Sequence, residues 1–153
     1  MIAASRFLCA AALAGAALSG HAQTQVWVNA GFISRHFDRS TDYREENWGL
    51  GAEAVFAPAH AAVAGTFINS ERQRSRYLGY QWRGLRRQPA GVDVHAGVIL
   101  ALVDGYPATR NGNAFLAPVP YVAIEGRRVG VNFVMLHNGE TAALAMQLKL
   151  RIR

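Results

Sequence analysis

The sequence is poor in cysteine and in lysine, and it contains no long hydrophobic run. Among 153 residues, Cys9 is the only cysteine and Lys149 the only lysine. A single thiol excludes an internal disulfide framework and a zinc site made of cysteines. The apolar run at residues 7–18 falls short of the about 20 residues that a helix needs to cross a bilayer. A disulfide-stapled domain and a helical membrane protein are therefore both disfavoured.

The N-terminus has the three regions of a secretory signal peptide. Arg6 supplies the positive region, residues 7–18 form an Ala-rich apolar region, and Gly20, His21 and Ala22 place small residues at a cleavage site. We expect cleavage after Ala22. Residues 1–22 are then removed together with Cys9, and residues 23–153 form a single domain, of the length that one domain usually has.

The expected mature chain is basic and arginine-rich. Without Arg6, 15 basic residues stand against 10 acidic ones, a net charge of +5. The guanidinium group binds phosphate and carboxylate through paired hydrogen bonds. The basic composition therefore indicates either an acidic or phosphorylated partner or an ordinary solvated surface. Nucleic acid fits poorly, because a secreted all-β chain offers no helix to enter a groove and no stacking motif.

From residue 24 onward, alternation with a period of two replaces any helical pattern. At the C-terminus, Leu144, Met146, Leu148, Leu150 and Ile152 alternate with polar or small residues, which is typical of a β-strand with one apolar face. Turn signals divide the chain into eight such segments. They span residues 24–37, 46–57, 60–70, 75–86, 91–103, 114–125, 127–137 and 141–153.

Eight strands of about 10 residues match the smallest common bacterial outer-membrane barrel. A soluble carrier barrel would put the apolar face inside. The opposite face is too polar for a dry core, since it contains Asn29, Glu53, His95 and Lys149. Aromatic residues near strand ends suit the two membrane interfaces, and they are Trp27, Trp48, Tyr77, Trp82 and Tyr121. We therefore predict an all-β, eight-stranded antiparallel up-and-down transmembrane β-barrel, monomeric, in the bacterial outer membrane.

Up-and-down order brings His36 and Ser70 to the same outer rim, because each ends an ascending strand. A serine hydroxyl becomes a nucleophile when a base such as imidazole takes its proton. Asn69 could orient the ring or donate to an oxyanion. The alternative is a strand-end histidine facing water and a turn-forming Asn-Ser pair.

Three arginines follow Ser70 directly: Arg72, Arg74 and Arg76. They could bind the phosphates of a lipid in the outer leaflet, or form a solvated loop. Pro118 and Pro120 each remove a hydrogen-bond donor from a predicted strand, so they mark either an edge irregularity or an opening through which lipid enters sideways. The histidines have no metal-ligand spacing, and we predict neither a metal nor a cofactor.

Several short motifs resemble the outer-membrane lipid A palmitoyltransferases, which are small eight-stranded barrels. These motifs are Tyr43-Arg44-Glu45-Glu46-Asn47-Trp48-Gly49, Phe67-Ile68-Asn69-Ser70, Gly79-Tyr80-Gln81-Trp82-Arg83 and Ala117-Pro118-Val119-Pro120. The resemblance covers most of the mature chain in order. It implies a shortened and divergent relative that lacks the family's N-terminal amphipathic helix and acts on lipid A and phospholipid.

Carried over by motif, the family's catalytic serine corresponds to Ser70 and its histidine to His36. The family's neighbouring aspartate is replaced by Asn69, and a glycine at the floor of its acyl-chain pocket is replaced by Gln81, which implies a shallower or blocked pocket. Three functions stay open: an acyltransferase or lipid acyl hydrolase acting at the outer leaflet, a non-catalytic barrel that binds lipopolysaccharide or has a structural role, and a soluble carrier barrel.

Overall fold

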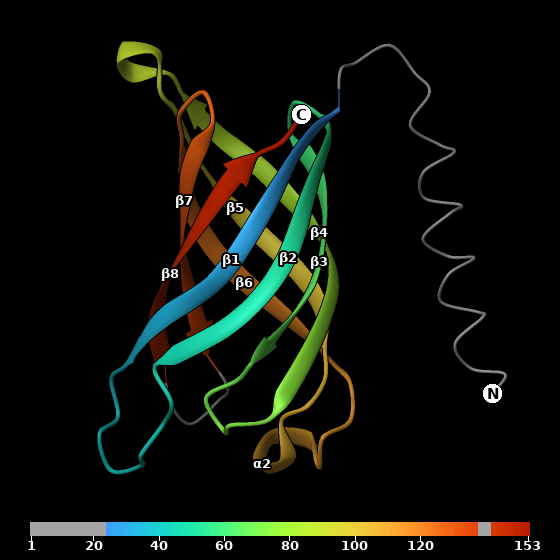
Figure 1. The fold of residues 1–153 in the computed structure, drawn as a ribbon, viewed down its shortest axis with the longest axis vertical. Coiled ribbons are helices and arrows are strands. Elements are labelled where there is room, and N and C mark those ends of the chain that lie inside the picture. The colour runs from blue at the N-terminus through green and yellow to red at the C-terminus, as the bar shows by residue number, and fades with distance from the viewer. Residues whose placement is uncertain (1–23, 138–141) are drawn as a thin grey trace, which may run out of the picture.

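The computed structural model describes residues 24–137 and 142–153, and within them the chain forms eight β-strands and two short helical turns (Figure 1). The predicted signal peptide lies outside the described residues. The strands are β1 (Gln25–His36), β2 (Glu46–Ala57), β3 (His60–Ile68), β4 (Arg74–Arg87), β5 (Asp93–Val103), β6 (Phe115–Glu125), β7 (Val129–His137) and β8 (Ala142–Arg151). The helical turns are η1 (Pro89–Gly91) and α2 (Pro107–Arg110).

Each strand pairs antiparallel with the next, and β8 returns to pair with β1, so the sheet closes into a barrel. The connections after β2, β4 and β6 and the two ends of the described chain lie at one end of the barrel, which we call the turn end. The connections after β1, β3 and β5 lie at the other, the loop end, where Figure 1 shows α2. The predicted eight-stranded antiparallel up-and-down barrel is confirmed, and each strand boundary lies within two residues of the predicted segment.

The outer surface is apolar on seven of the eight strands, while β3 presents the small side chains of Ala62 and Ala64. The predicted apolar face of β8 points outward, with Leu144, Met146, Leu148 and Leu150 each 40% or more exposed. The interior contains the polar face. Buried polar and charged residues there include Asn29, Asn47, Glu53, His95, Asn132 and Lys149.

A β-bulge in β1 changes which face Phe32 occupies. The register with β2 shifts between Ala30 and Phe32. Gly31 is the residue that the shift accommodates, since a Cβ there would lie 2.3 Å from the carbonyl oxygen of Asn47. An extra residue reverses the alternation that follows it. Phe32 therefore points into the barrel, whereas uninterrupted alternation from Val26 would place it on the outer face, and Ile33 is 59% exposed instead.

Of the five aromatic residues predicted to form belts at the membrane interfaces, two point outward and three point into the barrel. Trp48 and Trp82 are exposed on the outer surface. Trp27 is fully buried, where Lys149 Nζ lies 4.9 Å from the centre of its ring. Tyr121 is also buried, and Tyr77 lines an interior cavity. An aromatic ring at a polar-face position is held inside because the barrel interior offers partners for its hydroxyl or its π-system.

Four charged side chains from four strands form a closed network inside the barrel. Glu53 accepts hydrogen bonds from Arg83 Nη1 at 3.0 Å and from Lys149 Nζ at 2.9 Å. Glu125 accepts from Arg83 Nη2 at 2.8 Å and from Lys149 Nζ at 2.6 Å. His95 Nε2 lies 3.0 Å from Glu125 Oε1. Each carboxylate thus lies between two cations, which offsets the cost of burying all four charges.

The pairing of β6 with β7 covers only part of the two strands. Five residue pairs join them, from Tyr121 with Val134 to Glu125 with Gly130. Toward the loop end, β6 continues to pair with β5 as far as Phe115. Pro118 and Pro120 lie in this stretch, and because residues two apart direct their amides to the same neighbour, both lack a donor toward β7. The sheet is therefore open between β6 and β7 in the half of the barrel near the loop end.

Candidate functional site

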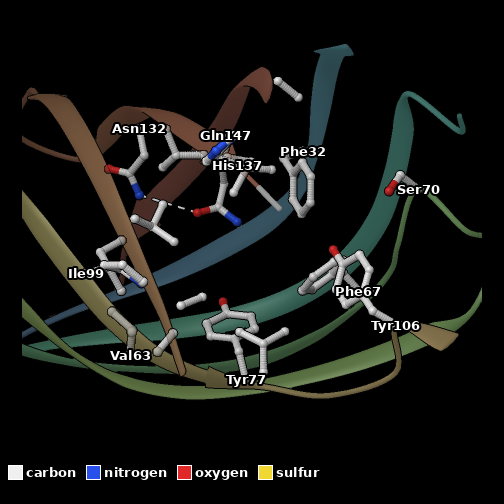
Figure 2. A pocket seen from close by; sticks show the side chains of 18 of the residues that line it. Phe32, Val63, Phe67, Ser70, Tyr77, Ile99, Tyr106, Asn132, His137 and Gln147 are labelled. Carbon is white, nitrogen blue, oxygen red and sulfur yellow. Dashed lines mark hydrogen bonds between the residues drawn. The ribbon is translucent and has the colours of Figure 1, made fainter. Parts of the chain in front are cut away.

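The barrel encloses a cavity of about 200 Å³ in the half near the loop end. Apolar side chains from most strands form its wall, among them Phe32, Val63, Phe67 and Ile99. Figure 2 shows Asn132 and Gln147 on one side of the cavity, joined by a hydrogen bond of 3.3 Å, and Ser70 on the other side. Glu53 of the charged network also reaches the cavity. The cavity is therefore mainly apolar, with a polar floor above the charged network.

Both margins of the opening between β6 and β7 line this cavity. Ala117, Pro118 and Val119 contribute from β6, and Val134 and Leu136 from β7. Since no strand pairing closes this stretch, the cavity lies directly behind the gap in the sheet. Of the two prolines that were predicted to mark either an edge irregularity or an opening, Pro118 thus lines the interior cavity.

His36 and Ser70 both line the cavity, as strand order predicts, but no hydrogen bond joins them. The His36 ring stacks on Tyr43 with 4.4 Å between the ring centres, and its Nδ1 has no hydrogen-bond partner among the described residues. The main-chain oxygen of Ser70 accepts a hydrogen bond from the amide of Arg44. The structure thus brings both residues to one cavity without connecting them as a nucleophile and its base.

Asn69 is fully buried, and its side chain holds the loop between β3 and β4. Its Nδ2 donates to Ser75 Oγ at 2.9 Å and to the carbonyl of Gly105 at 2.6 Å. Its Oδ1 accepts from the amides of Glu71 and Gln73. With these four bonds, the Asn69 side chain is engaged in shaping the loop rather than directed at the His36 ring.

Two of the three rim arginines are ion-paired with acidic residues in neighbouring connections. Arg72 Nη2 lies 2.7 Å from Asp42 Oδ2, and Arg76 Nη2 lies 2.7 Å from Asp104 Oδ2. Arg74 is exposed, and its side chain has no hydrogen bond or ion pair with the described residues. Of the three, Arg74 is the one whose guanidinium group is not already bound to an acidic side chain.

Gln81 is fully buried on β4, but it does not line the cavity. It lies between Tyr77, which lines the cavity, and Arg83 of the charged network, since every second residue of β4 points inward here. Neither its carboxamide nitrogen nor its oxygen makes a hydrogen bond of standard geometry with the described residues. The predicted pocket-floor residue is thus found two inward positions below Tyr77, outside the cavity.

Sequence reasoning missed two features of the site. Tyr106, in the connection between β5 and β6, lines the cavity mouth beside Phe115, with 6.0 Å between the ring centres. Burial raises the pKa of its hydroxyl, and the Glu71 carboxylate acts in the same direction. Tyr106 therefore stays a hydrogen-bond donor at neutral pH. The other feature is Arg83, a charged residue on the polar face of β4. Its partners in β2 and β6 cannot be identified from the spacing of residues in the sequence.

The described residues hold no group of three or more His, Cys, Asp or Glu side chains arranged for a metal ion. Residues 24–137 and 142–153 likewise include no helix long and apolar enough to span a membrane.

No protein-family model matches the chain, and no curated protein matches it. Among solved structures, it is similar to the solution NMR structure of the de novo designed TMB2.3, with a TM-score of 0.49 and 14% sequence identity over 88% of this chain and 99% of that one.

Proposed function

We propose that this protein is an outer-membrane barrel that binds a membrane lipid by taking part of one acyl chain into its interior cavity. The observation that carries the proposal is the cavity with apolar walls behind the gap between β6 and β7. A chain that enters through this gap need not leave the apolar phase, provided that the barrel lies in a bilayer.

The outer surface supports a location in a membrane. Large apolar side chains are exposed on seven strands, including Leu50, Leu78, Leu100, Leu116 and Leu148. Soluble monomers rarely expose contiguous apolar patches of more than a few hundred Å². A belt around the barrel, combined with a polar and charged interior, is the arrangement of a barrel that spans a bilayer. The bacterial outer membrane is where we propose that this barrel resides.

The size and lining of the cavity favour an acyl chain over a polar ligand. Drug-sized ligands occupy pockets of about 300–1,000 Å³, whereas an apolar cavity of about 150 Å³ is enough for a benzene molecule. About 200 Å³ with mainly apolar walls therefore suits a segment of one acyl chain. Because the gap is in the half near the loop end, the lipid headgroup would lie at that end, where Arg74 is available to a phosphate.

The second candidate is acyl transfer or acyl hydrolysis with Ser70 as the nucleophile and His36 as its base. It is favoured by the position of both residues on the cavity that would hold the acyl chain, and by the unpaired His36 Nδ1. Catalytic hydrogen bonds often tighten only when substrate binds. Lipid A or a phospholipid would supply the ester.

Binding is tested by native mass spectrometry of the barrel refolded with phospholipid in detergent micelles. Ala101 is buried and lines the cavity, so Ala101→Phe should fill it and remove a tightly retained phospholipid. Ala64→Phe adds the same ring to the outer surface and serves as the matched control. Equal retention by both variants would contradict the proposal.

Catalysis is tested by mass spectrometry of lipid A and phospholipids from cells with and without the protein. Ser70→Ala and His36→Ala should each abolish any change in the lipids, and the double variant should be scarcely worse, because members of a catalytic unit are not additive. Ser40→Ala, in the loop between β1 and β2, is the control. Identical lipids with and without an abundant folded barrel would leave only the binding function.

A further inference from the structure

The excess positive charge of the mature chain is confined to the turn end of the barrel. The interior network is neutral, with Glu53 and Glu125 against Arg83 and Lys149. The described side chains of the loop end comprise six arginines and six acidic residues, and one further arginine and one further acidic residue of the sequence, Arg110 and Glu140, lie outside the described side chains. The turn end has one acidic residue, Asp93, against Arg86, Arg87, Arg127, Arg128, Arg151 and Arg153. The net charge of +5 is therefore located there.

These arginines are mostly without acidic partners. Arg86 is ion-paired with Asp93 at 2.8 Å. None of the other five makes an ion pair with the described residues, and Arg87, Arg127, Arg128 and Arg153 are exposed. The positive charges of such a patch repel one another, so the patch with a bound anion is lower in free energy than the patch without one.

Four of them form one cluster where β7, β8 and β1 meet, which we call the arginine cluster: Arg127, Arg128, Arg151 and Arg153. The amide of Arg151 donates to the carbonyl of Arg128 at 2.7 Å, and the backbone of Arg153 pairs with Val26 of β1. Arg151 is held in place, because its Nη2 donates to the carbonyl of Gly126 at 2.9 Å and its guanidinium lies 5.0 Å from the Trp27 ring centre. Figure 1 shows the C-terminus and the turn between β6 and β7 at the same end of the barrel.

The apolar outer surface reaches the arginine cluster directly. Val129 follows Arg128 and is 60% exposed, and Ile152, between Arg151 and Arg153, is 62% exposed. In a bilayer these two side chains would contact acyl chains, and the guanidinium groups would lie at the level of the phosphates. A ligand that satisfies both surfaces has acyl chains and an anionic phosphate headgroup.

We infer that the arginine cluster binds anionic glycerophospholipids in the leaflet that surrounds the turn end. This inference rests on the proposed membrane location, but it concerns the leaflet opposite to the gap between β6 and β7. The recognition is electrostatic, through charge-assisted and bidentate hydrogen bonds from arginine to phosphate.

The test uses the full-length barrel inserted into nanodiscs of mixed phosphatidylcholine and phosphatidylglycerol. After extraction, native mass spectrometry gives the ratio of the two lipids that stay bound. We expect the wild type to retain an excess of phosphatidylglycerol that shrinks as salt rises. The triple variant Arg127→Gln, Arg128→Gln, Arg153→Gln should retain the two lipids at the ratio of the surrounding mixture.

The control removes the same charge from the loop end through Arg35→Gln, Arg39→Gln and Arg44→Gln, and it should keep the wild-type preference. Loss of preference in both triple variants, or in neither, would overturn the inference. Selective binding of lipopolysaccharide that disappears with the turn-end triple would assign the cluster to another lipid and overturn it as well. A wild type that inserts but has no preference refutes this inference alone, whereas failure to insert refutes the membrane location too.

Discussion

Replacing Glu53 by glutamine tests whether the charged network holds the barrel together. Glu53 is fully buried and accepts one hydrogen bond from Arg83 and one from Lys149. Glutamine keeps the shape but removes the charge, so two buried cations would share Glu125 alone. Removing one partner of a buried ion pair typically costs about 3–5 kcal/mol, because the remaining charge is left uncompensated. We expect a loss of stability in that range.

A second substitution separates charge balance from lost packing. Lys149→Met alone should also destabilise the barrel by about 3–5 kcal/mol, since it leaves two carboxylates for one arginine. In the double variant one carboxylate and one cation remain, and the charges balance again. We therefore expect it to be more stable than the sum of the single effects predicts, by up to about 3 kcal/mol, the upper range for residues in direct contact.

The assay is equilibrium unfolding in urea of the barrel in lipid vesicles, followed by the loss of β-sheet circular dichroism. Three proteins are compared with the wild type: each single variant and the double variant. Additive free-energy losses, or a single loss below about 1 kcal/mol, would show that the network is not a cooperative unit and that water or neighbouring groups compensate the charges.

Three further predictions follow from the outer surface and the strand pairing. Leu148→Arg, at a side chain that is 56% exposed in the middle of β8, should destabilise the inserted barrel by about 2–4 kcal/mol if that face meets lipid near the midplane, as measured by unfolding in vesicles against Ser40→Arg in a loop. Gly65→Ala should cost about 1–3 kcal/mol in the same assay, because the added Cβ would lie 2.7 Å from the Gly51 Cα and from the Leu50 carbonyl oxygen, and backbone atoms cannot move aside cheaply. Pro118→Val with Pro120→Val restores two amides toward β7, so hydrogen exchange at residues 134–137 should slow and the retained phospholipid should be lost; unchanged exchange would mean that the prolines do not keep the gap open.

The strands were predictable because the barrel repeats one simple constraint along the chain. On β8, large apolar residues alternate with small or polar ones from Leu144 to Leu150 without interruption. A period of two with one face apolar throughout indicates a β-strand. Turn residues then mark the strand ends: Pro58 and Ala59 separate β2 from β3, and Gly126 begins the turn after β6. Local chemistry was sufficient for the number, order and bounds of the strands.

The alternation failed where the backbone departs from regular pairing. Gly31 shifts the register of β1 and turns Phe32 into the cavity, but a glycine in a strand does not by itself reveal a bulge. Tyr77 is another case. Its ring lies over Gly51 and Gly65, whose missing side chains make room for it, and this fit depends on three strands together. Features that need the register of two or more neighbouring strands could not be predicted from a single segment.

The distribution of charge shows the same limit, and it changes where an anionic lipid is expected. In the sequence, Arg72, Arg74 and Arg76 form the most conspicuous basic cluster, which suggests a phosphate site at the loop end. The structure pairs Arg72 with Asp42, 30 residues away, and Arg76 with Asp104, 28 residues away, because these segments come together only when neighbouring strands pair. Arg127 and Arg128 have no such acidic neighbour, since the turn end has Asp93 alone and Arg86 already binds it. The strength of a basic patch therefore depends on which acidic residues the topology brings beside it, and by that criterion the turn end attracts anions more strongly than the loop end does.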